Sequence, residues 1–215
     1  ICVPTPTKQN GTQNLDPLLN VIKQLGKYSL VPPLIIKSTV LPGTCKKLNE
    51  KYNPKLRFSS NPEFLRANSA VEDFINPDRI VIGTCYPDVH MKLVELYQTF
   101  RTKRAFDYIV YTDSTTAEFI KYASNIFLAG KVAFALEMNR LAHILGADGI
   151  LALKTVGRDS RIGLSHLDPS KGKIPIDSPC LPKDLRAFNR HLEDLKDFGA
   201  ISEFLSKIEE LSLEK

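Results

Sequence analysis

The stretch from Asp113 to Gly146 constrains the fold more than any other part of the 215-residue chain. It contains no proline, and its apolar side chains recur at the spacing of an α-helix. Thr115 and Glu118 have the spacing of a capping box at its start. A helix of this length would span roughly 45–50 Å at 1.5 Å per residue. Its apolar residues occupy more than one side, whereas a helix that is wet on its outer face needs a single stripe. We therefore expect a long spine helix that is buried between domains or between subunits.

Before this helix, short apolar runs alternate with helical patterns. The runs are continuous in Val, Ile and Leu, as in strands that are covered on both faces. Such alternation is typical of an α/β fold with a mostly parallel sheet. The predicted strands lie at 33–40, 56–59, 79–83 and 108–111, and the predicted helices at 16–25, 44–52, 64–74 and 87–100.

No GxGxxG sequence occurs in the chain, although a Rossmann-like sheet normally carries this loop after its first strand. We therefore interpret residues 1–112 as the C-terminal half of a Rossmann-like parallel sheet. Residues 113–215 show helical patterns alone, with shorter helices at 150–156, directly after Cys180 and at 201–213. We predict a second, helical dimerisation domain there. The homodimer would form through the 113–147 helix, whose apolar sides otherwise leave a large exposed patch.

The composition is that of a soluble globular protein, with 43% hydrophobic and 25% charged residues. No apolar run approaches the length of a membrane span, and no signal peptide is visible, so we expect no membrane contact. The four cysteines are scattered and have no histidines at metal spacing, which favours a reducing cytoplasm and no metal site. The net charge of +5 is spread without a dense run, which disfavours nucleic acid and suits an anionic small molecule such as a nucleotide diphosphate.

Cys180 stands just outside a predicted helix start. Pro182 suits a first helical position, and the free N–H groups there favour a thiolate. Asp184 lies in the first turn and Lys183 beside it, so a nucleophile, an acid/base partner and a cation are close in sequence. The alternative is an ordinary helix start beside a buried cysteine, and local chemistry alone favours it. The helix then continues through Leu185, Phe188, Leu192 and Leu195.

The other three cysteines are predicted to be unreactive. Cys2 and Cys85 lie in or beside strands, where burial would raise the thiol pKa. Cys45 belongs to an amphipathic helix beside Lys46 and Lys47, and it is the one serious rival of Cys180.

Two polar residues of the spine helix, Lys121 and Asn125, are one turn apart and face the same way. By themselves they fit a solvated edge of the helix as well as a functional site.

Seven motifs occur in an order and spacing that resemble one family over nearly the whole chain. The chain is similar to the UDP-glucose/GDP-mannose dehydrogenases, a family of NAD-dependent nucleotide-sugar dehydrogenases. The motifs are Cys2-Val3-Pro4-Thr5-Pro6-Thr7, Lys37-Ser38-Thr39-Val40, Asn61-Pro62-Glu63-Phe64-Leu65, Asn76-Pro77-Asp78-Arg79-Ile80-Val81-Ile82-Gly83, Glu118-x-x-Lys121-x-x-x-Asn125-x-x-Leu128-Ala129, Asp159-x-Arg161-Ile162-Gly163 and Cys180-Leu-Pro-Lys-Asp184.

The resemblance implies oxidation of a sugar C6 alcohol to a carboxylate with two NAD⁺, through a cysteine-bound intermediate. It implies that Cys180 is the nucleophile, and that Asp184 and Lys121 activate water and stabilise oxyanions. Thr39 and Asn125 would hold the ordered water and the reacting oxygen, and Glu63 would be a further acid/base. The implied cofactor contacts are Pro4, Thr5, Thr39 and Lys183, and the implied substrate contacts are Glu63, Phe64, Leu65, Lys121, Asn125 and Arg161, the last reaching across the dimer.

Three departures from the family pattern bear on function. Ala67 replaces a second acid, and the loop 171–179 before Cys180 is nearly free of glycine. The GxGxxG half and the family's nucleotide-binding domain are absent from the 215 residues. We therefore expect the chain to be the middle of an enzyme, and by itself to bind NAD poorly and to be inactive.

Several alternatives stay open from the sequence. UDP-glucose is the expected substrate, with GDP-mannose and UDP-N-acetylmannosamine as the other sugars. A hydroxyacid dehydrogenase would also use a lysine and an asparagine on a long helix, but Cys180 and its Pro-Lys-Asp argue against it. A truncated dimerisation module without turnover is the non-enzymatic alternative.

Overall fold

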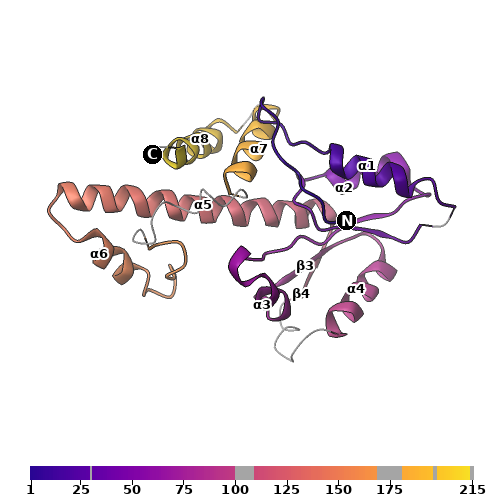
Figure 1. Cartoon of the computed structure of the whole chain (residues 1–215), viewed down its shortest axis with the longest axis horizontal. Coiled ribbons are helices and arrows are strands. Elements are labelled where there is room, and N and C mark those ends of the chain that lie inside the picture. Colours follow the sequence, from indigo (N-terminus) through magenta and orange to yellow (C-terminus); the bar gives the residue numbers. More distant parts are fainter. Residues whose placement is uncertain (30, 100–108, 169–180, 196–197, 214–215) are drawn as a thin grey trace. The chain divides into compact units, whose positions relative to one another are not determined.

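The computed structural model describes residues 1–29, 31–99, 109–168, 181–195 and 198–213 (Figure 1). Cys180 and the loop 171–179 therefore lie outside the described residues, as does the first residue of the strand predicted at 108–111. The chain forms two compact units: a first unit of residues 1–8 and 13–122, and a second unit of residues 9–12 and 123–215. The domains predicted at 1–112 and 113–215 stay a prediction.

The first unit is built on a four-stranded sheet in the order β1-β2-β3-β4. Its strands are β1 (Leu34–Ile36), β2 (Phe58–Ser60), β3 (Ile80–Gly83) and β4 (Ile109–Thr112). β1 pairs with β2 and β3 with β4 in parallel, whereas β2 and β3 meet antiparallel at Ser60 and Gly83. The α/β fold with a mostly parallel sheet is confirmed. The antiparallel pairing was not predicted, because β2 and β3 are buried throughout and such runs do not reveal strand direction.

Helices cover both faces of this sheet (Figure 1). Helices α1 (Asp16–Leu25) and α2 (Thr44–Tyr52) share a core with Leu34, Ile36 and Phe58. Helices α3 (Ala70–Ile75) and α4 (Pro87–Thr99) lie on the opposite face, where Ile35 packs against the second core. Alternate β1 residues therefore serve opposite cores, as the period of a strand requires. The second core contains Ile80, Ile82, Val89, Leu93 and Tyr97.

One strand and one helix of the first unit are shorter in the structure than the sequence predicted. β1 ends at Ile36. Shortly after it, the Ser38 hydroxyl accepts from the N–H of Val3 at 2.8 Å and donates to the carbonyl of Val3 at 2.7 Å, and these side-chain hydrogen bonds replace regular strand pairing. The helix predicted from Phe64 begins as a short 3₁₀ turn, Ala67–Ser69, before α3. Before that turn the backbone N–H of Leu65 bonds the Glu63 carboxylate, which holds this segment out of the helix.

The second unit contains most of the long helix α5 (Ser114–Ile144), with α6 (Gly149–Val156), α7 (Leu181–Glu193) and α8 (Gly199–Leu213). The 31-residue α5 confirms the predicted long helix. Figure 1 shows α6 on one side of α5 and α8 on the other. Gly130 of α5 faces α8, and a Cβ added there would make an ordinary contact with Ile208 Cδ1 at 3.5 Å. Residues 9–12 join this unit through Gly11, which lies against Arg186 and Arg190 of α7.

Two helix caps differ from those predicted. α5 is capped by Asp113, whose carboxylate accepts from the N–H and the hydroxyl of Thr116 at 3.0 and 2.6 Å. The capping box of Thr115 and Glu118 is therefore wrong, because Glu118 turns instead toward the start of α2. In α1, Asp16 is the first helical residue and not the cap, while the predicted end at Gly26 is confirmed.

By length and composition alone, α5 is apolar enough to cross a membrane, and it is the one such helix among the described residues. The expectation that no apolar stretch reaches this length is therefore wrong. The observation is weak evidence for a membrane span, because the core helix of a soluble protein has the same length and composition.

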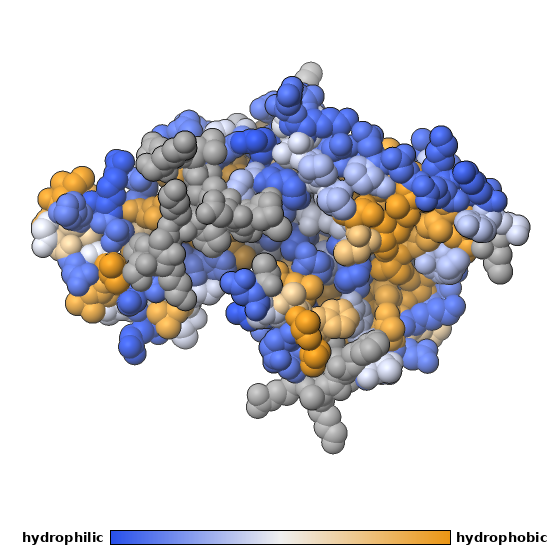
Figure 2. Space-filling model, in the orientation of Figure 1, coloured by the Kyte–Doolittle hydropathy of each residue, from blue (hydrophilic) through white to orange (hydrophobic). Residues whose placement is uncertain are grey.

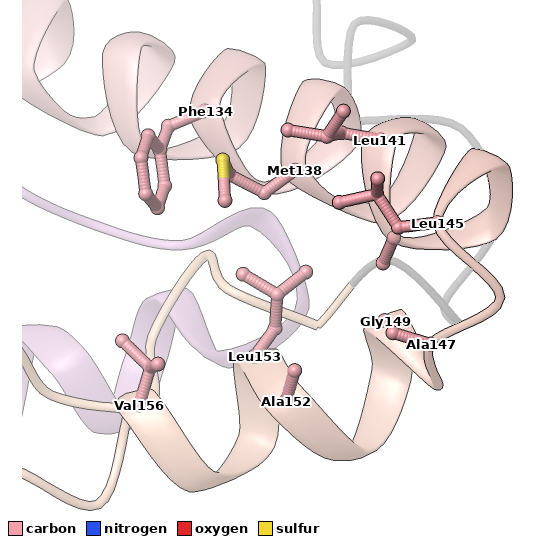
Figure 3. A pocket seen from close by; sticks show the side chains of 10 residues that line it. Phe134, Met138, Leu141, Leu145, Ala147, Gly149, Ala152, Leu153 and Val156 are labelled. Carbon is pink, nitrogen blue, oxygen red and sulfur yellow. The ribbon is translucent and has the colours of Figure 1, made fainter.

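The second unit exposes apolar surface where α5 meets α6 (Figure 2). Ile144 of α5 and Leu151 of α6 are 71% and 62% exposed, and Phe127, earlier on α5, is 69% exposed. Between the two helices lies an apolar groove of about 190 Å³ (Figure 3). Its lining includes Phe134, Met138, Leu141, Leu145, Leu153 and Val156.

Candidate active site

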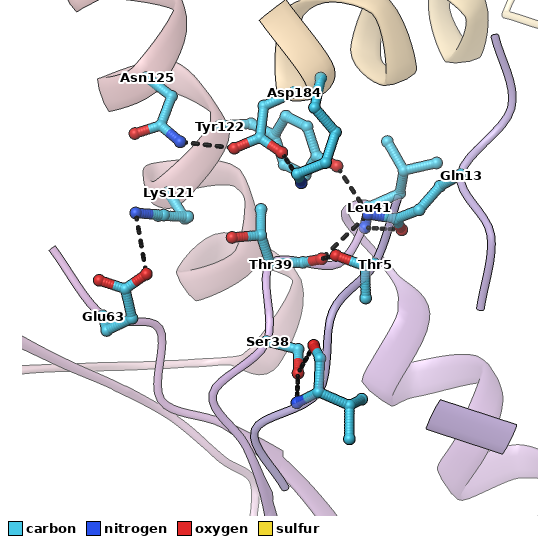
Figure 4. Close-up of polar contacts among 12 residues, drawn as sticks. Thr5, Gln13, Ser38, Thr39, Leu41, Glu63, Lys121, Tyr122, Asn125 and Asp184 are labelled. Atoms are coloured by element: carbon cyan, nitrogen blue, oxygen red, sulfur yellow. Dashed lines mark hydrogen bonds and ion pairs between the residues drawn. The ribbon is translucent and has the colours of Figure 1, made fainter. Parts of the chain in front are cut away.

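Lys121 is a buried lysine of α5 that faces two residues from the segment after β2. The residue is 7% exposed, and Nζ lies 3.8 Å from Oε1 of Glu63 (Figure 4). The same ammonium lies 5.2 Å from the centre of the Phe64 ring. A buried cation needs compensating partners, and here a carboxylate and an aromatic face supply them. The solvated-edge interpretation of Lys121 is therefore wrong.

Asn125 and Asp184 form a buried pair in the second unit. Nδ2 of Asn125 donates a 2.6 Å hydrogen bond to Oδ2 of Asp184, and the two residues are 8% and 1% exposed (Figure 4). Nζ of Lys183 donates to the other oxygen, Oδ1. Both carboxylate oxygens therefore have a donor, and a fixed carboxylate of this kind can exchange a proton with a correctly placed oxygen. Asn125 is thus buried too, and not on a solvated edge.

The segment after β1 brings Thr39 to Thr5. The carbonyl of Thr39 accepts from the Thr5 hydroxyl at 2.7 Å and from Nε2 of Gln13 at 2.9 Å. Thr5 is buried and its neighbour Pro4 is exposed. Thr39 follows the carboxyl end of β1, and its hydrogen bond holds Thr5 at the same place, which is where open α/β sheets bind ligands. The Thr-Pro and Ser-Thr motifs are therefore next to each other, as the resemblance requires.

A polar cluster that the sequence analysis did not single out holds the Glu63 segment. Nζ of Lys37 donates to the carbonyl and to Oδ1 of Asn61, at 3.1 and 3.2 Å, and to the Tyr97 hydroxyl at 3.2 Å. Nδ2 of Asn61 donates to the Val81 carbonyl at 2.8 Å. The ends of β1, β2 and β3 are thereby joined two residues before Glu63. The available signal was the presence of Lys37 and Asn61 in two of the motifs.

Comparison with known proteins agrees with this geometry. Sequence models of the UDP-glucose/GDP-mannose dehydrogenase family match residues 1–101, as its NAD binding domain, and residues 115–210, as its central domain. The chain belongs to this family. UDP-glucose 6-dehydrogenase of Rickettsia bellii is 40% identical over 193 residues, and the match covers 88% of this chain. UDP-glucose 6-dehydrogenase YwqF of Bacillus subtilis is 37% identical over 194 residues, and the match covers 87% of this chain. The chain spans 43% and 42% of the length of these two curated relatives.

Solved structures give the same family and fold. A UDP-glucose dehydrogenase from the archaeon Pyrobaculum islandicum has a TM-score of 0.82 and 34% identity, and the match covers 98% of this chain and 49% of that one. A UDP-D-ManNAc dehydrogenase from Pyrococcus horikoshii has a TM-score of 0.79 over 98% of this chain and 49% of that one, but its 23% identity shows the fold alone.

Two further residues that the family resemblance implies as substrate contacts are Arg161 and Leu65. Arg161 is exposed, and its guanidinium pairs with Asp159 of its own loop at 2.6 Å, its ionic partner within the described residues. This contact raises the pKa of Arg161 and lowers that of Asp159, in each case chiefly through their side-chain hydrogen bond. Leu65 is 36% exposed. No group of three or more His, Cys, Asp or Glu side chains that could hold a metal occurs in the described part of the chain.

The structure reverses the predicted environments of three cysteines. Cys45 is fully buried, and burial raises the pKa of its thiol well above the ordinary value, with a further increase from Glu118. Cys2 and Cys85, predicted to be buried, are exposed. Cys85 lies just after the end of β3, and Cys2 belongs to a segment that forms no regular strand. Cys45 is therefore no rival nucleophile, and the place of Cys180 lies outside the described residues.

Proposed function

We propose that the protein carrying this chain is an NAD-dependent nucleotide-sugar 6-dehydrogenase that acts on UDP-glucose. The burial of Lys121, Asn125 and Asp184, each with a polar partner, is the observation that carries the proposal. Burying these groups costs free energy unless they are paired, and a family that oxidises nucleotide sugars has a use for all three. The UDP-glucose 6-dehydrogenases among the relatives favour UDP-glucose over the other sugars.

The residues after β1 fit a dinucleotide. Thr5 and Thr39 are fixed to each other at the carboxyl end of the strand, with Pro4 exposed beside them. In our proposal these three residues and Lys183 hold NAD. The start of α2 does not take its phosphates, because the Glu118 carboxylate occupies those N–H groups. When bound, NAD supplies the hydride acceptor.

The proposed first half-reaction converts the alcohol to a covalent adduct. As a hydride leaves C6, Glu63 takes the hydroxyl proton, assisted by the nearby Lys121 ammonium. The Cys180 thiolate then adds to the aldehyde carbon, forming a C–S bond and an oxyanion that Lys121 and Asn125 stabilise. The sugar therefore remains attached to the enzyme between the two oxidations. Phe64, Leu65 and Arg161 are proposed as substrate contacts.

The proposed second half-reaction converts this adduct to the acid. A second hydride leaves the thiohemiacetal carbon and gives a thioester. Asp184 takes a proton from a water molecule that Thr39 helps to hold, and the hydroxide attacks the thioester carbon. The C–S bond breaks, Cys180 leaves as the thiolate, and the uronate is released. One sugar thus consumes two NAD⁺ and one water.

The test measures NADH formation by the protein expressed from the whole natural reading frame. We expect two NADH for each UDP-glucuronate, and less turnover with GDP-mannose or UDP-N-acetylmannosamine. Lys121→Ala should lower kcat about 100- to 10,000-fold, because it removes both proton-transfer and oxyanion support. Lys46→Ala, which removes an exposed lysine of α2, is the matched control and should be unchanged. Full activity of Lys121→Ala would refute the proposed mechanism, and inactivity toward all three sugars would refute the function.

We also propose that the protein is a cytoplasmic homodimer that uses the 113–147 helix. The exposed Phe127 and the apolar groove between α5 and α6 support this, because a patch of that kind is rarely left open to water. Sedimentation should give a dimer for the wild type and a monomer for Phe134→Asp, which places a charge in the groove. Val71→Asp, on the 75% exposed side chain of α3, is the control and should remain dimeric. A wild-type monomer at micromolar concentration would contradict the proposal.

A further inference from the structure

Glu118 of α5 binds the start of α2 through both of its carboxylate oxygens. Oε2 accepts from the N–H of Gly43 at 2.6 Å and of Thr44 at 3.1 Å, and Oε1 accepts from the N–H of Cys45 at 2.9 Å. Glu118 is 2% exposed, and α2 has no side-chain cap of its own at Gly43. The cap of α2 is therefore supplied by another helix, and it is a buried anion at the positive end of the helix dipole.

A second contact joins α5 to the same segment one turn later. Nε2 of Gln13 donates to the Tyr122 hydroxyl at 3.0 Å and to the Thr39 carbonyl at 2.9 Å (Figure 4). Oε1 of Gln13 accepts from the N–H of Leu41 at 3.1 Å. The segment 39–45 is thus attached to α5 at Glu118 and at Tyr122. Lys121 stands between these two attachment points on the helix.

The position of Lys121 depends on this attachment. Its ammonium lies at the end of a long side chain, 3.8 Å from Glu63, so a small rotation of α5 moves Nζ by more than it moves the backbone. Thr39, which is another first-unit group of the proposed reaction, belongs to the attached segment. A misplacement of 1 Å at a reacting group costs about 100-fold in rate. The contacts of Glu118 therefore help to fix the position of Lys121 relative to Thr39, and the proposed reaction uses both residues.

We propose that Glu118 is a positioning residue, which fixes Lys121 relative to Thr39 by binding the N–H groups of residues 43–45. This inference rests on the proposed function, since it requires that Lys121 act in the reaction. Burial raises the pKa of Glu118, while the hydrogen bonds from residues 43–45 oppose the rise. Glu118→Gln keeps the size of the side chain but points an NH₂ group at backbone N–H donors, so part of the attachment is lost.

The test compares Glu118→Gln in the wild-type and the Lys121→Ala backgrounds, with the protein from the whole reading frame. In the wild type, kcat should fall about 10- to 100-fold, with little change in the KM for either substrate. In the Lys121→Ala background, Glu118→Gln should cause no further decrease, because the group that it positions is gone. Equal decreases in both backgrounds would overturn the inference. Full activity of Lys121→Ala alone would instead remove the proposed role of Lys121, so the two failures are distinguishable.

A structural control separates positioning from loss of stability. Leu48→Ala removes buried contacts of α2 but leaves its cap in place, so it should lower the melting temperature without lowering kcat well below that temperature. If Leu48→Ala at equal destabilisation loses as much kcat as Glu118→Gln, the inference is wrong. Should Glu118→Gln not fold, Glu118→Asp keeps the charge, shortens the reach and gives the same two-background test.

Amide hydrogen exchange provides a readout that is independent of turnover. Glu118→Gln should speed exchange at residues 43–45, while the amides of β3 should keep their protection. Unchanged exchange at residues 43–45 would show that these N–H groups do not depend on Glu118, and would overturn the inference.

Discussion

The side-chain amide of Asn125 donates a 2.6 Å hydrogen bond to Asp184, and this contact joins α5 to the first turn of α7 within the second unit. Asp184 is 1% exposed, and in Asn125→Ala its carboxylate would lose the amide donor and keep the contact with Lys183. Loss of a hydrogen bond to a buried charge costs about 1.5–3 kcal/mol. We expect a decrease of that size in the free energy of unfolding, measured by urea denaturation.

The matched control for this prediction is the double variant. If the hydrogen bond is the cause, Asn125→Ala should cost much less in an Asp184→Ala background, where no anion is left unpaired. Additive effects of the two substitutions would show that Asn125 acts through its packing and not through Asp184.

Asp113 should stabilise α5 in a pH-dependent way. Its hydrogen bonds with the hydroxyl and the N–H of Thr116 lower the pKa of its carboxyl below the ordinary value of 3.8. A lowered pKa means that the stabilisation is present above 3.8 and is lost as the pH falls through the folded-state pKa. Asp113→Ala should therefore cost about 0.5–2 kcal/mol at neutral pH, and the difference from the wild type should shrink in acid.

Thr115→Ala is the control for the cap. Thr115 offers Asp113 its backbone N–H, which the substitution keeps, so the variant should unfold like the wild type. A larger loss of stability in Thr115→Ala than in Asp113→Ala would favour the capping box of Thr115 and Glu118 over the cap by Asp113.

Local signals were enough to predict most helices from the sequence. The predicted α2 agrees with Thr44–Tyr52 at both ends, and Pro17 and Gly26 mark the ends of α1 as expected. The long α5 followed from the absence of proline over its 31 residues. Periodicity, proline and glycine act within a few residues, so one sequence contains this information.

The errors arise where a distant residue competes with the local pattern. Glu118 has the spacing of a capping box, but its partners lie 73 to 75 residues earlier in the chain. Ser38 fits the predicted strand, yet it bonds to Val3, 35 residues away. Neither set of partners can be predicted from neighbouring residues in the sequence, because only the folded chain brings these groups together.

The candidate site could be predicted only in part, and for the same reason. Periodicity placed Lys121 and Asn125 on one side of a helix, but it did not show that they are buried. The resemblance supplied the roles of Glu63 and Asp184, and the structure supplied their contacts with Lys121 and Asn125. The role of Cys180 stays a prediction.

Gly83 should tolerate no side chain, because the start of α5 lies directly over it. An added Cβ would be 2.4 Å from the Cβ of Ala117 and 2.9 Å from backbone atoms of Asp113 and Ser114. Backbone cannot move aside as a flexible side chain can, so Gly83→Ala should lower the free energy of unfolding by about 1–3 kcal/mol. Gly199→Ala is the control, since nothing lies within 4 Å of its added Cβ, and it should be neutral or stabilising. Thermal unfolding of the two variants decides the matter, and a neutral Gly83→Ala would contradict the packing.

The cysteines should differ in reactivity according to burial and charge. The thiolate is the reactive form, and burial together with Glu118 raises the pKa of Cys45, so little thiolate is present there at neutral pH. Cys2 and Cys85 are exposed and should be alkylated at the rate of ordinary surface thiols. Cys180, proposed to sit before the start of α7 beside Lys183, should react at lower pH than either. The nearby Asp184 opposes this by repelling a second anion, but Lys183 donates to Asp184 and offsets part of its charge.

Iodoacetamide labelling of the folded protein as a function of pH, read by peptide mass, tests this order. Below pH ~7 we expect Cys180 to be modified first, because the proposed helix-start position lowers a thiol pKa below its free value. Cys2 and Cys85 are exposed and should be modified after Cys180, and Cys45 should label only when urea unfolds the first unit. Cys45→Ala separates burial from reactivity, since it should leave the labelling of the other three thiols unchanged. Early labelling of Cys45 in the folded protein would contradict its buried place against Glu118, and an inert Cys180 would remove the nucleophile from the proposed reaction.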